Sequence, residues 1–302
     1  MKFRRIGAPI AVAAVAAMLI TGCTTTGTEA PAATGGTITV AEVNELTAFT
    51  SSTSSTNLDM NGKFIGYTRS GFFYLDDKLN IVPDKSFGTV EKTSDDPLTV
   101  KYTLAKTATW SDGTPVTADD LLLAWAIQSG FFNDSTYDAD GNLTSGTTYF
   151  DYAGDTSGLG LADRPVVGDD NTSITLTYSQ PYADWQLVNP IDAPAHVVAD
   201  HAGVALADLS AAFLSAPRGD AAAPADPNAT IKAAADFWNT GFDATSLPTD
   251  KSLYLSSAAF VLDAWVPTES ITLVLNPEYK GDLKPKVDKI VVRFIGDAQA
   301  QV

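Results

Sequence analysis

The stretch from Trp110 to Ala126, WSDGTPVTADDLLLAWA, restricts the fold more than any other part of the sequence. Before it, apolar and polar residues alternate over residues 98–104, which predicts a strand. Asp112-Gly113 supplies a turn, and the proline that follows favours extended backbone at the residue before it. Thr117 is a good N-cap for a helix that begins with acidic residues. The stretch therefore predicts a strand, a tight corner and a helix in succession.

The same stretch holds a serine beside an aspartate, so a catalytic role has to be considered. A serine nucleophile needs a base within hydrogen-bond reach, and the base is usually a histidine oriented by a third group. The chain has two histidines, His196 and His201, and neither lies in a recognisable triad motif. Gly-x-Ser-x-Gly, a P-loop and His-Glu-x-x-His are all absent from the sequence. We therefore expect a folding corner and no catalytic residue.

A metal site is not expected either. The segment Asp138–Asn142, DADGN, resembles the start of a calcium loop. The EF-hand pattern requires glycine at its sixth position and a distal glutamate, whereas this chain has Leu143 at that position and no glutamate after it. A turn is the better interpretation, and the sequence indicates no cofactor.

Outside the corner, strand patterns outnumber helix patterns. Alternation typical of half-buried strands recurs in residues 37–43, 173–179, 270–276 and 288–296. Helical spacing occurs in residues 121–128, 205–216 and 231–242. This mixture predicts an α/β fold with α+β character.

The N-terminal residues have the pattern of a lipoprotein signal peptide. Lys2, Arg4 and Arg5 precede an apolar run from Ala8 to Ile20, which suits a secretory signal and is too short to span a bilayer. The run ends in an aliphatic residue, two small residues and Cys23, which resembles the lipobox of bacterial lipoproteins. We expect residues 1–22 to be the signal peptide, Cys23 to carry the lipid, and residues 23–36 to form a flexible tether.

The net charge and the hydropathy of the chain exclude some classes of binding partner. The whole chain carries a formal charge of −17 although its leader is positive, so the remainder is strongly acidic. Such a surface repels phosphate backbones, which argues against nucleic-acid binding. No second long apolar run follows the leader. We therefore expect a monomer held by its lipid on the extracytoplasmic face of the cell membrane.

The block WSDGTPVTADDLLLAW closely resembles a characteristic block of the family 5 extracellular solute-binding proteins, the oligopeptide-binding components of ABC importers. The resemblance continues on both sides of this block and in the family's order, through residues 70–87, 94–110 and 260–295. Together these segments cover much of residues 37–295. An ordered series of matches is more specific than any one of them.

The resemblance implies a periplasmic-binding-protein-like type II fold, in which two lobes close on a ligand. By this comparison residues 36–74 and 171–295 form the first lobe, and residues 75–170 form a subdomain added to it. Residues 296–302 would start a second lobe that is largely missing. A helix that begins at Asp297 and stops within about two turns also suggests truncation. We expect such a fragment to present half a cleft and to bind ligand weakly or not at all.

The resemblance also implies a function: capture of peptides, in particular oligopeptides, for delivery to an ABC permease in the membrane. In such proteins an irregular stretch after the first strand presents polar groups to the peptide. The corresponding residues 47–61 place Ser55, Thr56, Asn57 and Asp59 as candidate ligand contacts. Phe260 stands where the family typically has the tyrosine of a Gly-x-Tyr entry, so its ring is a further candidate contact without a hydroxyl.

Alternatives remain open at this point. The family also includes binders of oligosaccharides, nickel and haem, and aromatic residues such as Tyr67, Phe72 and Trp185 could serve a peptide or a sugar. Two histidines and one cysteine make a protein-supplied nickel site a poor interpretation. A surface-anchored hydrolase is the alternative from a different class of protein.

Overall fold

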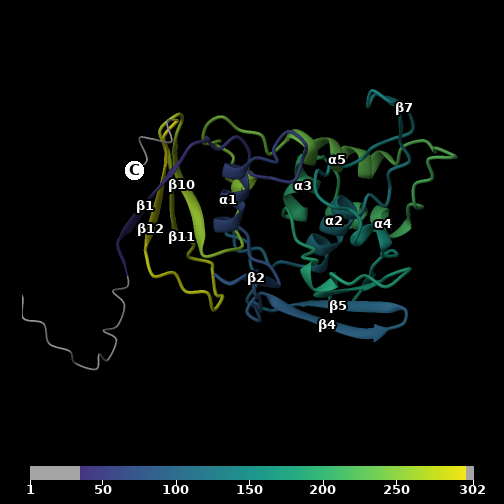
Figure 1. Cartoon of the computed structure of the whole chain (residues 1–302), viewed down its shortest axis with the longest axis horizontal. Helices are drawn as coiled ribbons and strands as arrows, with labels where there is room; N and C mark the ends of the chain where they lie inside the picture. Colours follow the sequence, from purple (N-terminus) through teal and green to yellow (C-terminus); the bar gives the residue numbers. More distant parts are fainter. Residues whose placement is uncertain (1–34, 297–302) are drawn as a thin grey trace, which may run out of the picture. The chain divides into compact units, whose positions relative to one another are not determined.

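In the computed structural model, which describes residues 35–296 within one compact unit, one sheet joins the two ends of this range. Strand β1 (Thr37–Glu42) runs parallel to β12 (Lys289–Phe294), which pairs antiparallel with β11 (Ser270–Leu275). Strand β10 (Phe260–Val266) completes the order β1-β12-β11-β10. Figure 1 shows the purple β1 beside the yellow β12. The strands expected at residues 37–43, 270–276 and 288–296 are confirmed.

A second sheet has the order β4-β5-β9-β8, and all its pairings are antiparallel. Its members are β4 (Gly88–Asp95), β5 (Leu98–Leu104), β8 (Val166–Val167) and β9 (Ser173–Thr177). Strand β5 is central and buries every second residue, as its alternation predicts. Strand β9, which the family comparison would assign to the first lobe, pairs with strands from residues 75–170, so the lobe boundary stays a prediction.

Two short hairpins extend from these layers. Strands β2 (Phe73–Leu75) and β3 (Ile81–Pro83) form the first hairpin, and β6 (Thr136–Tyr137) and β7 (Leu143–Ser145) form the second. The turn of the second hairpin is the DADGN segment. The Asp138 carboxylate accepts hydrogen bonds from the backbone N–H groups of Asp140 and Asn142, so it closes this turn as expected.

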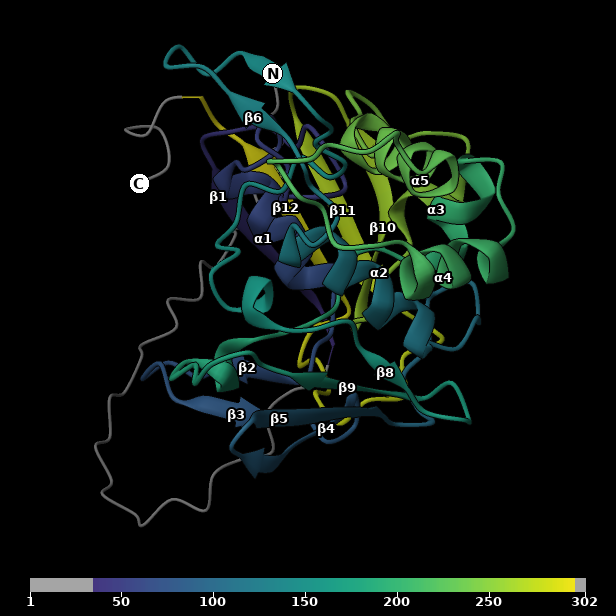
Figure 2. The ribbon, with the colours of Figure 1, turned by 90° about the vertical axis from the view of Figure 1, so that its right-hand side faces the viewer.

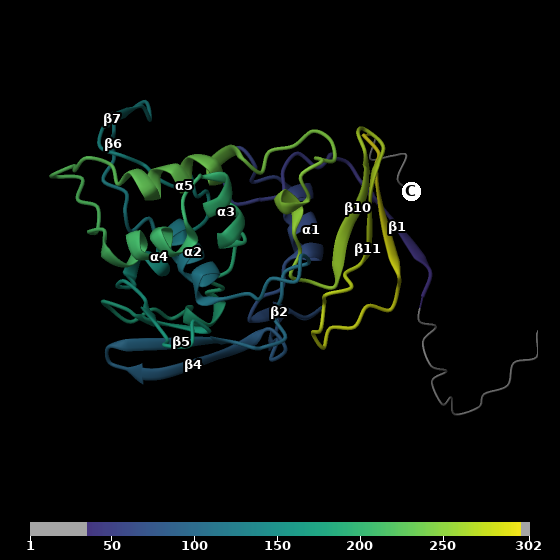
Figure 3. The ribbon, with the colours of Figure 1, turned by 180° about the vertical axis from the view of Figure 1, so that it is seen from behind.

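Four of the five α-helices within residues 35–296 pack on one another. They are α2 (Ala118–Ser129), α3 (Ala195–His201), α4 (Leu206–Ser215) and α5 (Ala229–Thr240), with α2 also against strand β9. The fifth, α1 (Asp59–Thr68), lies against β10 of the first sheet. Figure 3 shows this division, and Figure 2 shows α2 above the second sheet. Single 3₁₀ turns occur at Leu159–Leu161, Trp185–Leu187 and Lys251–Tyr254.

The corner predicted from residues 110–126 is confirmed. Trp110 is fully buried at its start, and the backbone N–H of Thr114 donates to the Asp112 carboxylate in the turn. Thr117 is the N-cap of α2, and its N–H donates a 2.7 Å hydrogen bond to Oδ2 of Asp120 in the first helical turn. Nearly every residue of α2 is buried, so the corner places this helix at the centre of the helical layer.

Among the helices described here, no single one has the length and hydropathy to cross a bilayer. Helices α3 and α4 together meet the length and composition criteria, but they bend by 102° where they join. The expected signal peptide, Cys23, the tether up to residue 34 and the expected helix start at Asp297 lie outside the described residues.

Candidate ligand-binding site

Two adjoining hollows lie around the turn that follows helix α1. The first, of about 250 Å³, is lined by Gly66, Tyr67, residues 69–71, Phe73, Tyr74 and residues 258–260, together with Asp84, Tyr279 and Leu283. The second, of about 240 Å³, is lined by Phe49, Thr50, Ser52, Ile65, Gly66, residues 69–71, Phe73, Gln128, Asn189 and residues 191–193. Both hollows share Gly66, Arg69, Ser70, Gly71 and Phe73. The turn at residues 69–71 therefore forms the ridge between them.

A third hollow, of about 450 Å³, extends this row. It shares Gln128 and Asn189 with the second hollow and is lined further by Tyr152, Tyr182 and Leu187. We call the three hollows together the groove. Its walls come from loops and element ends that are far apart in the sequence, which is how binding sites are usually built on a rigid scaffold.

Arg69 is the basic residue of the ridge. Helix α1 ends at Thr68, whose hydroxyl donates to the Phe64 carbonyl, and Arg69 continues in extended conformation. The guanidinium is held by backbone oxygens: Nε donates a 3.0 Å hydrogen bond to the Asp192 carbonyl, and Nη1 donates to the Leu255 carbonyl. Desolvation lowers the pKa of Arg69 to about 10, so it stays protonated at neutral pH.

Asp192 lies in the second hollow, and its carboxylate is already engaged. Its Oδ2 accepts a 2.8 Å hydrogen bond from the Ser52 hydroxyl, and its Oδ1 accepts a 2.9 Å hydrogen bond from the Trp238 indole. Burial raises the pKa of Asp192, and these two hydrogen bonds oppose the rise. This carboxylate therefore fixes the second hollow by joining the loop before α1 to helix α5.

Neighbouring backbone groups hold the ridge on both sides. The N–H of Ser70 donates to the Ser257 hydroxyl, and the N–H of Ser257 donates to the Thr68 carbonyl. The N–H of Phe72 donates a 3.1 Å hydrogen bond to Oδ1 of Asn189. The ridge is thus preorganised by contacts with residues more than one hundred positions later in the chain.

Of the residues expected from sequence to contact ligand, Phe260 lines the first hollow. Ser55, Asn57 and Asp59 are exposed and lie on the loop and first turn leading into α1, outside the lining of the three hollows. Thr56 is buried, and its hydroxyl bonds to that of Thr53. None of these four residues lines the three hollows, and their contact with ligand stays a prediction.

The polar residues at the ridge were not identified from sequence. Arg69 and Asp192 belong to no short motif, and their proximity depends on the tertiary fold. From the same loop as the predicted contacts, Thr50 and Ser52 line the second hollow instead. Among the aromatic residues considered from sequence, Tyr67 lines the first hollow, whereas Phe72 and Trp185 line another hollow beside β2 and β3, which shares Phe73 with the first two.

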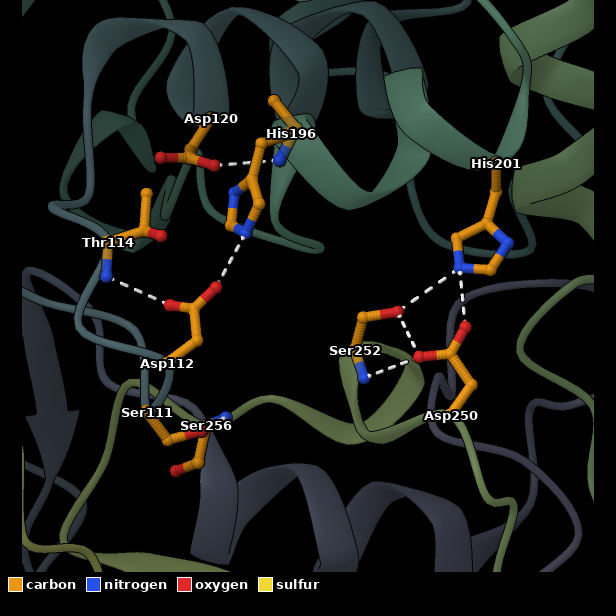
Figure 4. Close-up of polar contacts among 10 residues, drawn as sticks. Ser111, Asp112, Thr114, Asp120, His196, His201, Asp250, Ser252 and Ser256 are labelled. Atoms are coloured by element: carbon orange, nitrogen blue, oxygen red, sulfur yellow. Dashed lines mark hydrogen bonds and ion pairs between the residues drawn. The ribbon is translucent and has the colours of Figure 1, made fainter.

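The two histidines do not build a catalytic triad within the described residues (Figure 4). Nε2 of His201 lies 3.1 Å from the Ser252 hydroxyl and 3.3 Å from the Asp250 carboxylate. A triad requires the serine and the acid at opposite ring nitrogens, whereas here both partners are at one nitrogen. Nε2 of His196 lies 3.1 Å from Oδ2 of Asp112, the carboxylate of the corner turn.

The known proteins to which this chain is similar support the fold described above. Residues 85–302 match the bacterial extracellular solute-binding proteins, family 5. An uncharacterized lipoprotein of Mycobacterium tuberculosis is 30% identical over 217 residues, which are 71% of this chain and 34% of that protein. An uncharacterized lipoprotein of Mycobacterium leprae is 30% identical over 75% of this chain and 36% of its own length. The chain therefore spans about a third of the length of these relatives.

Solved structures show the same fold in part. A periplasmic EDTA-binding protein, EppA, superposes with a TM-score of 0.65 at 22% identity, covering 89% of this chain and 41% of that one. The oligopeptide-binding protein AppA of Bacillus subtilis, in complex with a nonapeptide, gives a TM-score of 0.58 at 16% identity, covering 88% and 41%. The architecture is that of a periplasmic-binding-protein-like fold, represented here by part of it. The chain belongs to family 5 of the bacterial extracellular solute-binding proteins.

Proposed function

We propose that this protein is the substrate-binding lipoprotein of an ABC importer and that it captures peptides outside the membrane for delivery to a permease. The observation that carries the proposal is the groove, a row of three adjoining hollows across the ridge at residues 69–71. An extended ligand suits such a row better than a compact one. The family membership supports the importer role.

The chemistry of the groove suits a peptide. Aromatic rings of Tyr67, Phe73 and Phe260 offer apolar contact in the first hollow. The side-chain amides of Gln128 and Asn189 stand between the second and third hollows, where they can pair with main-chain groups. Solved relatives bind a nonapeptide in the Bacillus subtilis protein and a pentapeptide in that of Thermus thermophilus.

The groove would form one wall of a two-lobed cleft. In this proposal residues 36–74 and 171–295 belong to the first lobe, residues 75–170 to its added subdomain, and a second lobe closes over the ligand. Closure would signal to the permease that the site is occupied. Lipid on Cys23 would keep the protein, as a monomer, at the extracytoplasmic face of the membrane.

The experiment is ligand-induced stabilisation of the full-length protein without turnover. A pool of short synthetic peptides, maltooligosaccharides and a nickel–histidine chelate are tested separately by thermal unfolding, and recovered ligands are analysed by mass spectrometry. We expect the peptide pool alone to raise Tm and to be recovered intact. Cleavage of the peptides would favour the hydrolase alternative, and stabilisation by sugars or chelate alone would reassign the ligand.

Two substitutions then test the site. Phe260→Ala should weaken binding of the best peptide about tenfold, because it removes an apolar wall of the first hollow. Asn57→Ala tests the loop prediction independently, since Asn57 is exposed and substitution there leaves the core intact. Unchanged affinity in Asn57→Ala would discard residues 55–59 as ligand contacts without affecting the groove.

A further inference from the structure

We infer that the guanidinium of Arg69 binds a carboxylate of the captured solute. The inference rests on the proposed capture function and names the chemical group that the ridge recognises. Arg69 lines both the first and the second hollow, so a ligand that crosses the ridge meets its charge. Neither the sequence motifs nor the predicted contact residues point to this side chain.

Arg69 has donors left for a ligand. Its Nε and Nη1 donate to the carbonyls of Asp192 and Leu255, and Nη2 makes no hydrogen bond with any residue in the range 35–296. Within the same range the guanidinium has no ion-pair partner inside 4.0 Å. The Asp192 carboxylate attracts the guanidinium electrostatically but accepts its hydrogen bonds from Ser52 and Trp238. The guanidinium is therefore a partly buried cation whose charge is balanced only at a distance, by Asp192 and Asp120, and whose Nη2 has no acceptor among the described residues.

A second donor lies beside it. Ser70 also lines both hollows, and its hydroxyl makes no hydrogen bond with another described residue. A carboxylate placed at the ridge can accept from Nη2 of Arg69 and from this hydroxyl together, in a charge-assisted arrangement. A dianion such as phosphate fits less well, because Asp84 and Asp192 line the same two hollows and would repel the additional charge.

The test compares matched probes on the full-length protein. The first pair is one peptide from the stabilising pool with a free C-terminal carboxylate and the same peptide as its C-terminal amide. The second set is independent of peptides and consists of acetate and N-acetylglycine, each of which carries a single carboxylate, with inorganic phosphate as the dianion control. Affinities are measured calorimetrically for the wild type and for each variant.

Arg69→Gln should weaken binding of the carboxylate probes about 10- to 100-fold, as expected for a lost charged hydrogen bond, and should leave the amide peptide nearly unchanged. Because Arg69 also holds two backbone carbonyls, Tm of this variant is measured in parallel. Arg69→Lys retains the charge but not the planar group, so it should restore part of the loss.

A second pair of variants leaves Arg69 in place. A Cβ built on Gly66 meets no atom within 4 Å, so a side chain fits there without displacing the fold. Residue 66 is one turn before Arg69, and Gly66→Asp would bring a competing carboxylate to the guanidinium. We expect about tenfold weaker binding of carboxylate probes in Gly66→Asp than in its uncharged reference, Gly66→Asn.

The possible outcomes separate the inference from the function on which it rests. If the peptide acid and amide bind equally, or their difference survives in Arg69→Gln, the inference is wrong while peptide capture stands. If no peptide binds but acetate or N-acetylglycine binds in an Arg69-dependent way, peptide capture fails and the carboxylate site stands. If no carboxylate probe shows dependence on Arg69, or phosphate binds more tightly, the inference is overturned.

Discussion

The guanidinium of Arg69 lies over the indole ring of Trp110, with its central carbon 5.2 Å from the ring centroid. Trp110 begins the corner that leads into helix α2, and Arg69 forms the ridge of the groove. The electron-rich face of the ring stabilises the cation where backbone carbonyls are its other partners. The corner that the sequence makes most conspicuous therefore also supports the candidate binding site.

The first prediction concerns Trp110. The side chain is fully buried, so Trp110→Ala should lower the free energy of unfolding by roughly 3–5 kcal/mol through lost contacts and a cavity. Urea denaturation followed by circular dichroism measures this change. Trp185→Ala is the matched control, because Trp185 is only partly buried and should cost much less. Equal losses in the two variants would show that the corner does not depend on Trp110.

The second prediction concerns the pH dependence of stability. Desolvation raises the pKa of Asp120 to about 6, although the N–H groups of Thr117 and Ala195 donate to its two oxygens. Between about pH 4 and pH 6 the folded protein keeps a proton that the unfolded chain has released, so this group's contribution to stability falls as pH rises. Relative to Asp120→Asn, the wild type should lose about 3 kcal/mol across this range.

The measurement is the free energy of unfolding of both proteins at a series of pH values. Subtracting the Asp120→Asn values from the wild-type values removes the contributions of the other carboxyl groups to the pH dependence of stability. Several of these groups have lowered pKa values. Asp138→Asn is the control: hydrogen bonds from Asn142 lower the pKa of this exposed turn carboxylate, so its stabilising contribution is lost only at more acidic pH. A wild-type minus Asp120→Asn difference that stays flat between pH 4 and pH 7 would refute the assignment.

Sequence patterns predicted the helices and strands in which buried and exposed residues alternate regularly, or whose capping residues are adjacent to them in the sequence. Strands β5, β9, β11 and β12 and helices α2, α4 and α5 follow from periodicity, because each presents one apolar face to the core or is apolar throughout. Helix α1 was not predicted. Its sequence DMNGKFIGYT contains two glycines and few strong helix formers, and packing against β10 outweighs this weak propensity.

The candidate site was predicted less completely. Phe260 was expected from the family resemblance and lines the first hollow, although its contact with ligand stays a prediction, whereas Arg69, Asp192 and Asn189 have no local pattern. Asp192 and Arg69 are 123 residues apart, and the hydrogen bond between them runs from a side chain to a backbone carbonyl. Every residue type supplies a backbone carbonyl, so this contact does not require an aspartate at the accepting position. A single sequence therefore gives no signal for this pairing.

The third prediction concerns the lipid anchor. Cys23→Ala should prevent attachment of diacylglycerol and move the protein from the membrane fraction to the soluble fraction, because no acyl chain then enters the bilayer. Metabolic labelling with a radioactive fatty acid and fractionation of cells measure both effects. Thr21→Ala keeps a small residue in the lipobox and should retain label and location. Labelled, membrane-bound Cys23→Ala protein would place the anchor elsewhere.

The last prediction tests how the ridge is held. A Cβ on Gly71 would lie 2.2 Å from Nδ2 and 2.8 Å from Oδ1 of Asn189. Gly71→Ala must therefore displace the Asn189 side chain, which then loses its hydrogen bond from the N–H of Phe72. We expect a loss of about 1–2 kcal/mol in the free energy of unfolding and weaker peptide binding, because Asn189 also lines the groove.

A double-mutant cycle distinguishes this mechanism from a general loss of backbone freedom. In the background of Asn189→Ala the collision is absent and the hydrogen bond is already lost, so adding Gly71→Ala should cost close to nothing. The coupling free energy should be about 1–2 kcal/mol. Gly66→Ala is the control for replacing a glycine with open space around it, and this helical position should gain roughly 0.5–1 kcal/mol. Additive effects of Gly71→Ala and Asn189→Ala would mean that the two residues do not hold the ridge together.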